Sequence, residues 1–529
     1  MGFWRLTPPN AGGKFAGLRI YPRARDYLGH LLCSFPIMLL LIVLAPIAAA
    51  VLIMLGLPAR ITALAVSALT LLATVLMFLA FKSVVPGFQF VTTIAISTEL
   101  RLNFTLGVDG LSLLMILLGA ILLLAAVWFT GEIEHHQNAF YACLLLIAGG
   151  AIGAFASLDL FFFYAFHELA LIPTFLLIGI WGSGNRRAAA WKVTIYLALG
   201  SVILLVGLIM LYRAVPASAR SLDLRDLQAA AAAGQIAPAI QSSIYLVLLI
   251  GFGILISLVP FHTWAPEAYA SAPAPAAMLH AGLLKKFGLY GLLRLSLPLL
   301  PEGARHWSGL LMALLLANII YIGFVTIAQR RLDWMLGYSS VMHMGYIFLG
   351  IASANVLGTT GAAILMFAHG LSIALLFGIT GEIRKRVPSL DFDAMGGLAK
   401  QMPVAAFAFG LGVFAAIGLP GFANFAAEIM IVFGAFRNGF DYQHFHIFQW
   451  ATLLALWGVV ISAIYMLRAY RWTFFGSHVR VDDRISDLRP GFRFPIALLV
   501  AASILIGFFP QIAVQRITPT FRNYLTAKE

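Results

Sequence analysis

Charged residues are scarce in this sequence: Asp, Glu, Lys and Arg together make up only 10% of its 529 residues. Hydrophobic residues account for 61%, and the mean hydropathy is +0.95. A soluble globular domain carries about 25% charged residues, so this composition excludes an ordinary soluble protein. The sequence is that of a membrane protein.

Cysteine is almost absent, since only Cys33 and Cys143 occur, each alone in an apolar stretch. This excludes an iron–sulfur cluster held by cysteines and gives no disulfide framework. Neither a GxGxxG turn after a strand nor a GxxxxGK[ST] loop is present, which excludes nucleotide chemistry in this chain. No close His/Asp/Glu pair has the spacing of metal ligands, so no metal site is expected.

Apolar runs long enough for a helix to cross a bilayer recur from one end of the chain to the other. Each is expected to be helical, because a backbone exposed to lipid must satisfy its own hydrogen bonds. We count about fourteen of them: roughly 35–56, 61–81, 111–129, 139–157, 160–181, 191–212, 243–260, 276–298, 308–328, 335–353, 358–381, 403–436, 449–470 and 494–511. The predicted fold is an all-α polytopic membrane protein with a single membrane domain over 34–529.

The net charge of +13 would suggest nucleic acid in a soluble protein, but here the basic residues gather in short loops. Such loops set orientation in the membrane, so no nucleic-acid partner is expected. Counting spans puts the basic loops on one side, which is then cytoplasmic, with both termini outside. Residues 1–33 form a basic extension without the order of a signal peptide. We interpret it as a translocated surface extension, the alternative being a span count that is wrong by one. The basic loops contain Arg186–Arg187, Arg330–Arg331, Arg384–Arg386 and Arg471–Arg493.

Two spans are predicted to be interrupted. The run over 403–436 is too long for one straight crossing and contains Pro420, which lacks an amide proton and breaks a helix. The span that ends at Pro260 runs on into a second proline-rich element. One broken helix in each half is typical of transporters built from inverted repeats, here expected over about 139–298 and 308–470.

Glu168 lies near the middle of an apolar span, where a charge costs at least ~2.5–3.5 kcal/mol and marks an ion path by default. The alternative is a fixed ion pair with a lysine of a neighbouring helix, for which Lys192 is available. Pro173 frees a backbone carbonyl one turn away. Glu168 is therefore a candidate for holding and passing a proton.

Lys285 and Lys286 lie side by side within another span. Adjacent helical residues point about 100° apart, so only one is expected to face a given polar route, and the other to snorkel or to cap a carbonyl. A desolvated lysine is a good reversible proton carrier. His280, more than one turn earlier, could extend a water-linked relay.

Glu428 follows the Pro420 break by eight residues, an arrangement typical of ion sites in transporters. His343 and His369 lie within consecutive spans between the lysines and Glu428 in chain order. A single such histidine is usually a satisfied core residue, but two on consecutive helices leave a relay and a core role as equal alternatives.

These residues fall in stretches that resemble the antiporter-like proton-pumping subunits of respiratory complex I, NADH:quinone oxidoreductase, and among them subunit M (mitochondrial subunit 4). The resemblance covers roughly 100–480 in collinear order. Its stretches are LGVDGLSLLMILL (106–118), HELALIP around Glu168, VPFHTWAPEAY (259–269), APAPAAMLHAGLLKKFGLYGLLR (272–294), YSSVMHMGY (338–346), AHGLSIALLF (368–377), GGLA (396–399) and GLPGFANFAAEIMIVFG (418–434).

The resemblance implies fourteen helices in two inverted repeats. It assigns Glu168 to the carboxylate of helix 5, Lys286 to the central lysine of helix 8, and Glu428 to the glutamate of helix 12 at the exit. His343 and His369 match the connecting histidines. A glutamate rather than a lysine at position 428 favours subunit M.

The sequence departs from the family's pattern at Leu255, where helix 7 usually carries a lysine that partners the helix-5 carboxylate. No lysine occurs anywhere in 241–262. Either Lys192, Lys285 or His280 takes over this role, or the input half-channel is altered and its coupling weakened.

The resemblance therefore implies a proton-translocating subunit of a bacterial inner-membrane enzyme, driven by redox chemistry elsewhere. Flavin, iron–sulfur clusters and quinone are expected in partner subunits and no cofactor in this chain. Its expected partners are other membrane subunits, including neighbouring antiporter-like ones. The alternatives are a subunit of a multisubunit Na⁺/H⁺ antiporter or of a membrane-bound hydrogenase, and a spacer that lost pumping when Leu255 replaced the lysine.

Overall fold

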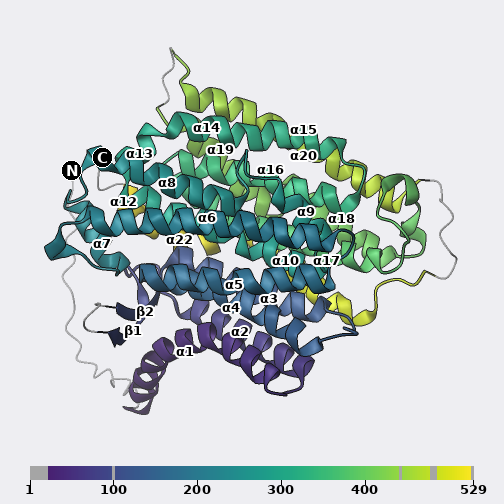
Figure 1. Ribbon diagram of the computed structural model, residues 1–529, viewed down its shortest axis with the longest axis horizontal. Coiled ribbons are helices and arrows are strands. Elements are labelled where there is room, and N and C mark those ends of the chain that lie inside the picture. The colour runs from purple at the N-terminus through teal and green to yellow at the C-terminus, as the bar shows by residue number, and fades with distance from the viewer. Residues whose placement is uncertain (1–21, 98–101, 440–443, 477–484, 526–529) are drawn as a thin grey trace, which may run out of the picture.

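The computed structural model is a bundle of helices that lie side by side along its long axis (Figure 1). It describes residues 22–97, 102–439, 444–476 and 485–525, with side chains from residue 36 on. Most of the expected extension over 1–33 lies outside the described residues, and its last part, from Pro22, begins the first helix.

Twelve helices of the described part are long and apolar enough to cross a membrane, which confirms the predicted polytopic class. The elements that contain them are α1 (Pro22–Met54), α2 (Ala59–Ala80), α3 (Gly110–Phe129), α4 (Gln137–Ala156), α5 (Leu160–Trp181), α6 (Arg186–Ala214), α8 (Pro238–Ile256), α14 to α15 (Ser308–Leu316 and Ile322–Ala328, joined by a π-helical turn), α16 (Leu332–Ala352), α17 (Val356–Arg384), α20 (Ile447–Phe474) and α21 (Arg493–Phe508).

The two remaining predicted spans are irregular. The span over 276–298 alternates α and π turns: α10 (Ala274–Leu279), a π turn over His280–Leu284, α11 (Lys286–Gly291), a second π turn over Leu292–Ser296, and α12 (Leu297–Leu299). The span over 403–436 is split into α18 (Pro403–Ile417) and α19 (Ala423–Arg437). Short π segments inside helices occur frequently at functional sites.

Both predicted interruptions are confirmed, and both use the same backbone geometry. Helix α8 ends at Ser257, with φ +71°, and the chain resumes as α9 (Trp264–Ser271). Helix α18 ends at Gly418, with φ +80°, before α19 begins. A left-handed residue at the C-terminus is a common way to end a helix, because it satisfies some of the last carbonyls and leaves others open.

Short polar side chains begin several of the helices. Asp109 accepts a hydrogen bond from the Ser112 amide at 3.0 Å at the start of α3, and Asp159 accepts from the Phe161 amide at 2.8 Å at the start of α5. Asn355 caps α17 through the Gly358 amide at 2.9 Å. Each bond satisfies one of the free amides that a helix start leaves without an intrahelical partner.

The remaining elements lie mainly at the ends of the bundle. An antiparallel hairpin of β1 (Gln89–Ser97) and β2 (Leu102–Val108) and the short helix α7 (Leu224–Ala232) lie at the left end in Figure 1. Helix α13 (Pro301–His306) follows α12, and α22 (Gln511–Leu525) packs on α3 and α17. Helices α3, α4, α16 and α17 are almost wholly enclosed, whereas α2, α6 and α20 carry exposed apolar side chains suited to lipid.

A buried ion pair ties the irregular helix to α3. The Arg294 guanidinium donates to both carboxylate oxygens of Asp109, each at 2.6 Å, and to the Tyr524 hydroxyl at 3.2 Å. Bidentate arginine–carboxylate pairs are strong and fix geometry as well as charge. The segment that carries Lys285 and Lys286 is thus anchored within its second π turn.

The basic loops lie at one end of the bundle, as predicted. Arg384 contacts Ser183 in the loop before α6, and Arg386 donates to the Ser486 carbonyl at 3.0 Å. Arg331 lies 4.0 Å from Asp391, in the loop that follows α17. Loops far apart in the sequence therefore meet at the end of the molecule opposite the hairpin (Figure 1).

Candidate functional site

Glu168 lies half-buried on α5, and its partner is a serine rather than a lysine. The Ser201 hydroxyl of α6 donates to Glu168 Oε1, and the same hydroxyl lies 3.3 Å from the Tyr164 hydroxyl. Because α5 and α6 are antiparallel and joined by a short loop, Ser201 lies level with Glu168. Lys192 lies nine positions nearer the loop, about 13 Å away at 1.5 Å per residue.

The ion pair considered between Glu168 and Lys192 is therefore not formed. Lys192 Nζ contacts Glu267 Oε2 of α9 at 2.8 Å instead, and both side chains are partly exposed, at 35% and 23%. The pair lies just after the first helix interruption. Its partial exposure differs from the near-complete burial of the lysines on the irregular helix.

Leu255 lies beside the residue that precedes the partner of Glu168. Its side chain is buried and packs against Gly200 of α6, the residue before Ser201, so closely that a Cβ at position 200 would lie 3.1 Å from Leu255 Cδ2. The space beside the partner of Glu168 is thus filled by hydrocarbon, and no basic side chain occurs in α8.

Lys286 and His369 form the central contact of the site. Lys286 Nζ lies 2.9 Å from His369 Nδ1 of α17 and donates to the Ala281 carbonyl at 2.7 Å. The two segments approach backbone to backbone beside this contact, because a side chain at Gly370 would lie 2.8 Å from the Gly282 carbonyl. Small residues permit such close helix contacts in membranes.

Lys285 points to a different helix from Lys286, as their adjacency predicts. Its Nζ lies 3.3 Å from the Ser340 hydroxyl of α16 and 5.2 Å from the centroid of the Tyr269 ring. His280 Nδ1 lies 3.4 Å from the hydroxyl of the same tyrosine. Lys285, His280 and Tyr269 thus form a second buried polar group on the side of α9.

His343 extends the line from Lys286 toward the second helix interruption. The centroids of the His343 and His369 rings lie 5.5 Å apart, so the two imidazoles are neighbours. His343 Nδ1 lies 2.8 Å from the Ser339 carbonyl, and Nε2 lies 2.9 Å from the Ala416 carbonyl in the last turn of α18. A neutral imidazole has one N–H, so both contacts are hydrogen bonds only in the doubly protonated ring.

Glu428 lies on α19 directly beside the break that ends α18. The residue is 8% exposed. A side chain added at Gly418 would collide with the Glu428 carboxylate, and the positive φ of Gly418 also favours glycine. The interruption therefore places the Ala416 carbonyl next to the His343 ring and the Glu428 carboxylate next to Gly418.

Comparison with known proteins shows the family of this chain. Residues 157–455, more than half of the chain, match the family model described as NADH:quinone oxidoreductase/Mrp antiporter, TM. The chain belongs to this family.

Curated relatives of the antiporter-like family cover most of the chain. NADH-quinone oxidoreductase subunit M of Rhodobacter capsulatus is 34% identical over 87% of this chain and 89% of its own length. NAD(P)H-quinone oxidoreductase chain 4 1 of Synechococcus sp. strain JA-2-3B'a(2-13) is 35% identical over 79% of this chain and 78% of its own. These relatives support the resemblance to subunit M.

Solved structures share the fold. A chain of respiratory complex I from Thermus thermophilus with bound NADH aligns with a TM-score of 0.82 at 27% identity, over 92% of this chain and 99% of that one. A chain of the Mrp complex from Dietzia sp. DQ12-45-1b aligns with a TM-score of 0.76 at 21% identity, over 94% and 98%. The second match concerns the fold alone.

His167 is a buried polar residue that was not among the predicted site residues. It precedes Glu168 in α5, and its ring stacks on Phe287, the neighbour of Lys286, with centroids 4.0 Å apart and planes 5° apart. Neither of its ring nitrogens has a hydrogen-bond partner among the described residues. The signal was its place beside Glu168 in an apolar span, where a polar residue needs a reason.

The described contacts do not join the polar line at every step. No hydrogen bond or ion pair among the described residues joins Glu168 to Lys286 or His343 to Glu428. His167, the residue before Glu168, stacks on Phe287, the residue after Lys286. Within the same residues no group of three or more His, Cys, Asp or Glu side chains is placed to hold a metal ion.

Proposed function

We propose that this chain carries protons across the bacterial inner membrane as an antiporter-like subunit of NADH:quinone oxidoreductase. The observation that carries the proposal is the buried line Lys286–His369–His343 that ends at Glu428 beside a broken helix. The subunit M relatives support the choice of enzyme. The chain itself does no redox chemistry in this proposal.

Lys286 and His369 are the proton donor and acceptor of the central step. The ammonium of Lys286 is 2.9 Å from His369 Nδ1, within the heavy-atom range for direct proton transfer. When the proton moves, the lysine becomes neutral and keeps the Ala281 carbonyl 2.7 Å away as an acceptor for one of its remaining N–H bonds. The charge thus moves from one buried group to the next, and His369 Nε2, which has no hydrogen-bond partner among the described residues, is free to pass a proton on.

His343 and Glu428 form the exit side. A proton released from His369 Nε2 reaches His343 through water, and the doubly protonated His343 ring is held between the Ser339 and Ala416 carbonyls. Glu428 then accepts the proton beside the turn at Gly418. Half-helix ends beside a carboxylate are a recurring ion-site design in transporters.

Glu168 is the entry-side carboxylate of the proposal, with His167 and His280 as the polar groups nearest to the route from there to Lys286. Moving one charge against 100 mV costs about 2.3 kcal/mol. Changes of a few hydrogen bonds around Lys286 supply energies of this size. Conformational change transmitted from partner subunits is therefore sufficient to drive the step.

Partner subunits hold the flavin, iron–sulfur clusters and quinone in this proposal, and neighbouring antiporter-like subunits flank the chain in the membrane. We also propose that the regions 139–298 and 308–470 are two inverted repeats. The identical backbone geometry at Ser257 and Gly418 supports this division, since each repeat then contains one helix that ends in a left-handed residue before a proline.

The test of the assignment is to tag the chain in its native host, solubilise membranes gently and identify the proteins that co-purify. The proposal predicts flavin and iron–sulfur subunits in a complex that reduces quinone with NADH. A complex of small membrane subunits that exchanges Na⁺ for H⁺ would favour the antiporter instead, and one that oxidises hydrogen would favour the hydrogenase.

A further inference from the structure

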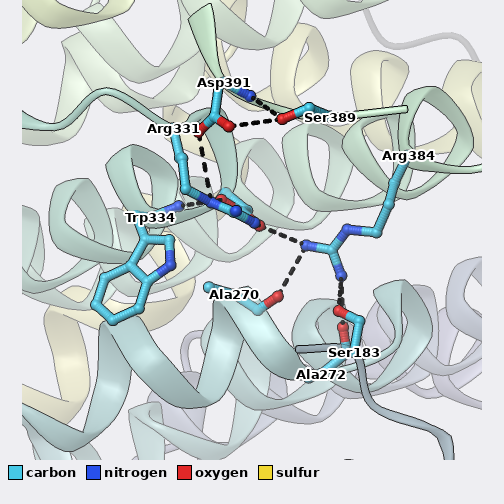
Figure 2. Close-up of polar contacts among 9 residues, drawn as sticks. Ser183, Ala270, Ala272, Arg331, Trp334, Arg384, Ser389 and Asp391 are labelled. Carbon is cyan, nitrogen blue, oxygen red and sulfur yellow. Dashed lines mark hydrogen bonds and ion pairs between the residues drawn. The ribbon is translucent and has the colours of Figure 1, made fainter. Parts of the chain in front are cut away.

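Arg384, the last residue of α17, lies at a junction of four segments, which Figure 2 shows in close-up. Its guanidinium donates to the Asp333 carboxylate of α16 at 2.9 Å and to the Ser183 hydroxyl, in the loop between α5 and α6, at 3.0 Å. It also donates to the Ala270 carbonyl of α9 at 2.8 Å. We call Ser183, Ala270, Asp333 and Arg384, with the Ala272 carbonyl, the arginine junction.

The junction satisfies the open carbonyls at the end of α9. Ala270 and Ala272 accept from Arg384, at 2.8 and 3.4 Å, and the Ser271 carbonyl between them accepts from the Ser183 amide at 2.8 Å. The last carbonyls of a helix have no intrahelical partner, and a buried carbonyl left without one is costly. The end of α9 is therefore held by side chain and backbone groups of other helices.

Asp333 fixes the arginine in this position. It is 1% exposed and accepts from Arg384 and from Arg331, the latter at 3.0 Å. Arg331 is itself 47% exposed and makes no contact with α9 among the described hydrogen bonds. Arg384 is thus the member that joins the buried carboxylate to the α9 carbonyls.

The segments that meet here are the ones that carry the proposed proton route. Along the sequence, α9 is followed by Pro273, by α10 and then by the segment that contains Lys286. Asp333 lies ten residues before His343 on α16, about 15 Å along the helix, and Arg384 lies fifteen residues after His369 on α17, about 22 Å. Helices α17 and α10 also touch near the junction, because a side chain at Gly381 would collide with Ala274.

Lys286 is consequently held from two ends. Beyond it, Arg294 pins the irregular helix to Asp109 of α3. Before it, the arginine junction pins the corner between α9 and α10 to α16 and α17. The first π turn, over His280–Leu284, lies between these anchors, and the second, over Leu292–Ser296, contains Arg294 itself. Lys286 therefore lies in the part of the helix whose hydrogen bonding is least regular.

We propose that Arg384 is a positioning residue that sets the contact between Lys286 and His369 from the opposite end of their helices. The proposal rests on the proton route described above. Loss of Arg384 frees the end of α9 and allows α10 to shift against α17, which lengthens the 2.9 Å contact. Proton transfer depends steeply on such distances, and a displacement of about 1 Å can cost up to ~100-fold.

The experiment compares Arg384→Gln with Lys385→Gln in the intact enzyme complex, measured in inside-out membrane vesicles. Lys385 is the matched control, because it is the next residue, carries the same charge and pairs only with Glu382 at 2.6 Å among the described contacts. Protons moved per NADH oxidised are recorded across pH, together with the amount of assembled complex. Arg384→Lys and Asp333→Asn serve where Arg384→Gln does not assemble.

The proposal predicts that Arg384→Gln lowers protons per NADH by about tenfold and displaces the pH profile. Asp333→Asn should lower protons per NADH by a similar factor, and Arg384→Lys should lower it less. Lys385→Gln retains the parental value.

Two results would overturn the inference. Equal behaviour of Arg384→Gln and Lys385→Gln, while Lys286→Ala abolishes pumping, would remove the role of Arg384 and leave the proposed function standing. A loss of pumping in Arg384→Gln that only follows a loss of assembled complex, with protons per NADH unchanged in the complex that remains, would mean that the junction stabilises the protein without acting on the lysine.

Discussion

The two interrupted helices share a backbone and differ in chemistry. At the first, the Ser257 amide donates to the Ile254 carbonyl at 3.2 Å and the Leu258 amide to the Gly253 carbonyl at 2.8 Å. At the second, the corresponding bonds run from Gly418 to Ala415 at 3.1 Å and from Leu419 to Phe414 at 3.0 Å. The two helix ends are thus closed by the same pair of bonds.

The side chains around these turns are unlike. Beside Gly418 lie the Glu428 carboxylate and the His343 ring, and both belong to a buried polar line. Near Ser257 lies the buried side chain of Leu255. The Val259 amide donates to the side-chain oxygen of Asn318, a neutral group, at 2.8 Å. A broken helix therefore prepares a site for a charged group but does not determine that one is present.

The comparison assigns different tasks to the two halves. Glu428 is buried next to its helix break, whereas Glu168 is half-buried and bonded to a serine hydroxyl. The ion pair nearest the first break, Lys192–Glu267, is partly exposed. We infer that the proton-transferring groups are concentrated from Lys286 onward, and that the first half depends on Glu168 without a buried lysine partner.

Among changes that compare the two breaks, the largest effect should come from Glu428→Gln, which keeps the shape of the side chain and removes its ability to accept a proton. Delivery of protons past His343 should fall by at least about tenfold, in line with the loss of a positioned acid–base group. Protons per NADH in vesicles measure this. Glu168→Gln is the comparison in the first half, and a greater loss there than at Glu428 would reverse the assignment of tasks.

Gly418→Ala should come next, because a methyl group at this position meets the Glu428 carboxylate and the left-handed conformation costs about 1–2 kcal/mol for a residue other than glycine. We expect less assembled complex, a lower melting temperature and reduced pumping. Ser257→Gly is the matched control at the first break, where a non-glycine residue already adopts φ +71°. Its pumping should stay at the parental value, and a large loss would mean that the first break carries chemistry of its own.

Leu255→Lys should have a smaller effect that distinguishes a pump from a spacer. The new ammonium would enter the space beside Gly200 and Ser201, close to Glu168, at an insertion cost of ~2.5–3.5 kcal/mol that pairing offsets in part. A pumping chain should change its protons per NADH, with Leu255→Met as the uncharged control of similar volume. The same number of protons per NADH in both variants would support the interpretation of this chain as a spacer.

Much of the fold was predictable because its signals are local. Span lengths follow from apolar runs, and the breaks follow from Pro260 and Pro420, whose effect on a helix does not depend on distant residues. The twelve long helices and the two irregular spans agree with the predicted positions. The π turns around Lys286 could not be predicted, since they arise from packing rather than from a residue type.

The site was predictable in its residues and less so in its pairs. The close approach at Gly282 and Gly370 decides that Lys286 meets His369, and helix rotation decides that Lys285 does not. Lys192 pairs with Glu267 and not with Glu168 because of its position along α6. Helices α5 and α6 run antiparallel from a short loop, so Ser201 lies level with Glu168 and Lys192 lies nearer the loop. His167 was not predicted, because a single histidine in an apolar span gives a weaker signal than the charged residue that follows it.

The most direct test of the central claim is the pair Lys286→Ala and Lys285→Ala, made in the intact complex and compared by protons moved per NADH oxidised. The two changes remove the same group one residue apart, but only Lys286 contacts His369. The account predicts that Lys286→Ala abolishes proton movement through this chain, whereas Lys285→Ala keeps most of it. Unchanged pumping in Lys286→Ala would contradict the route from Lys286 through His369 and His343 to Glu428.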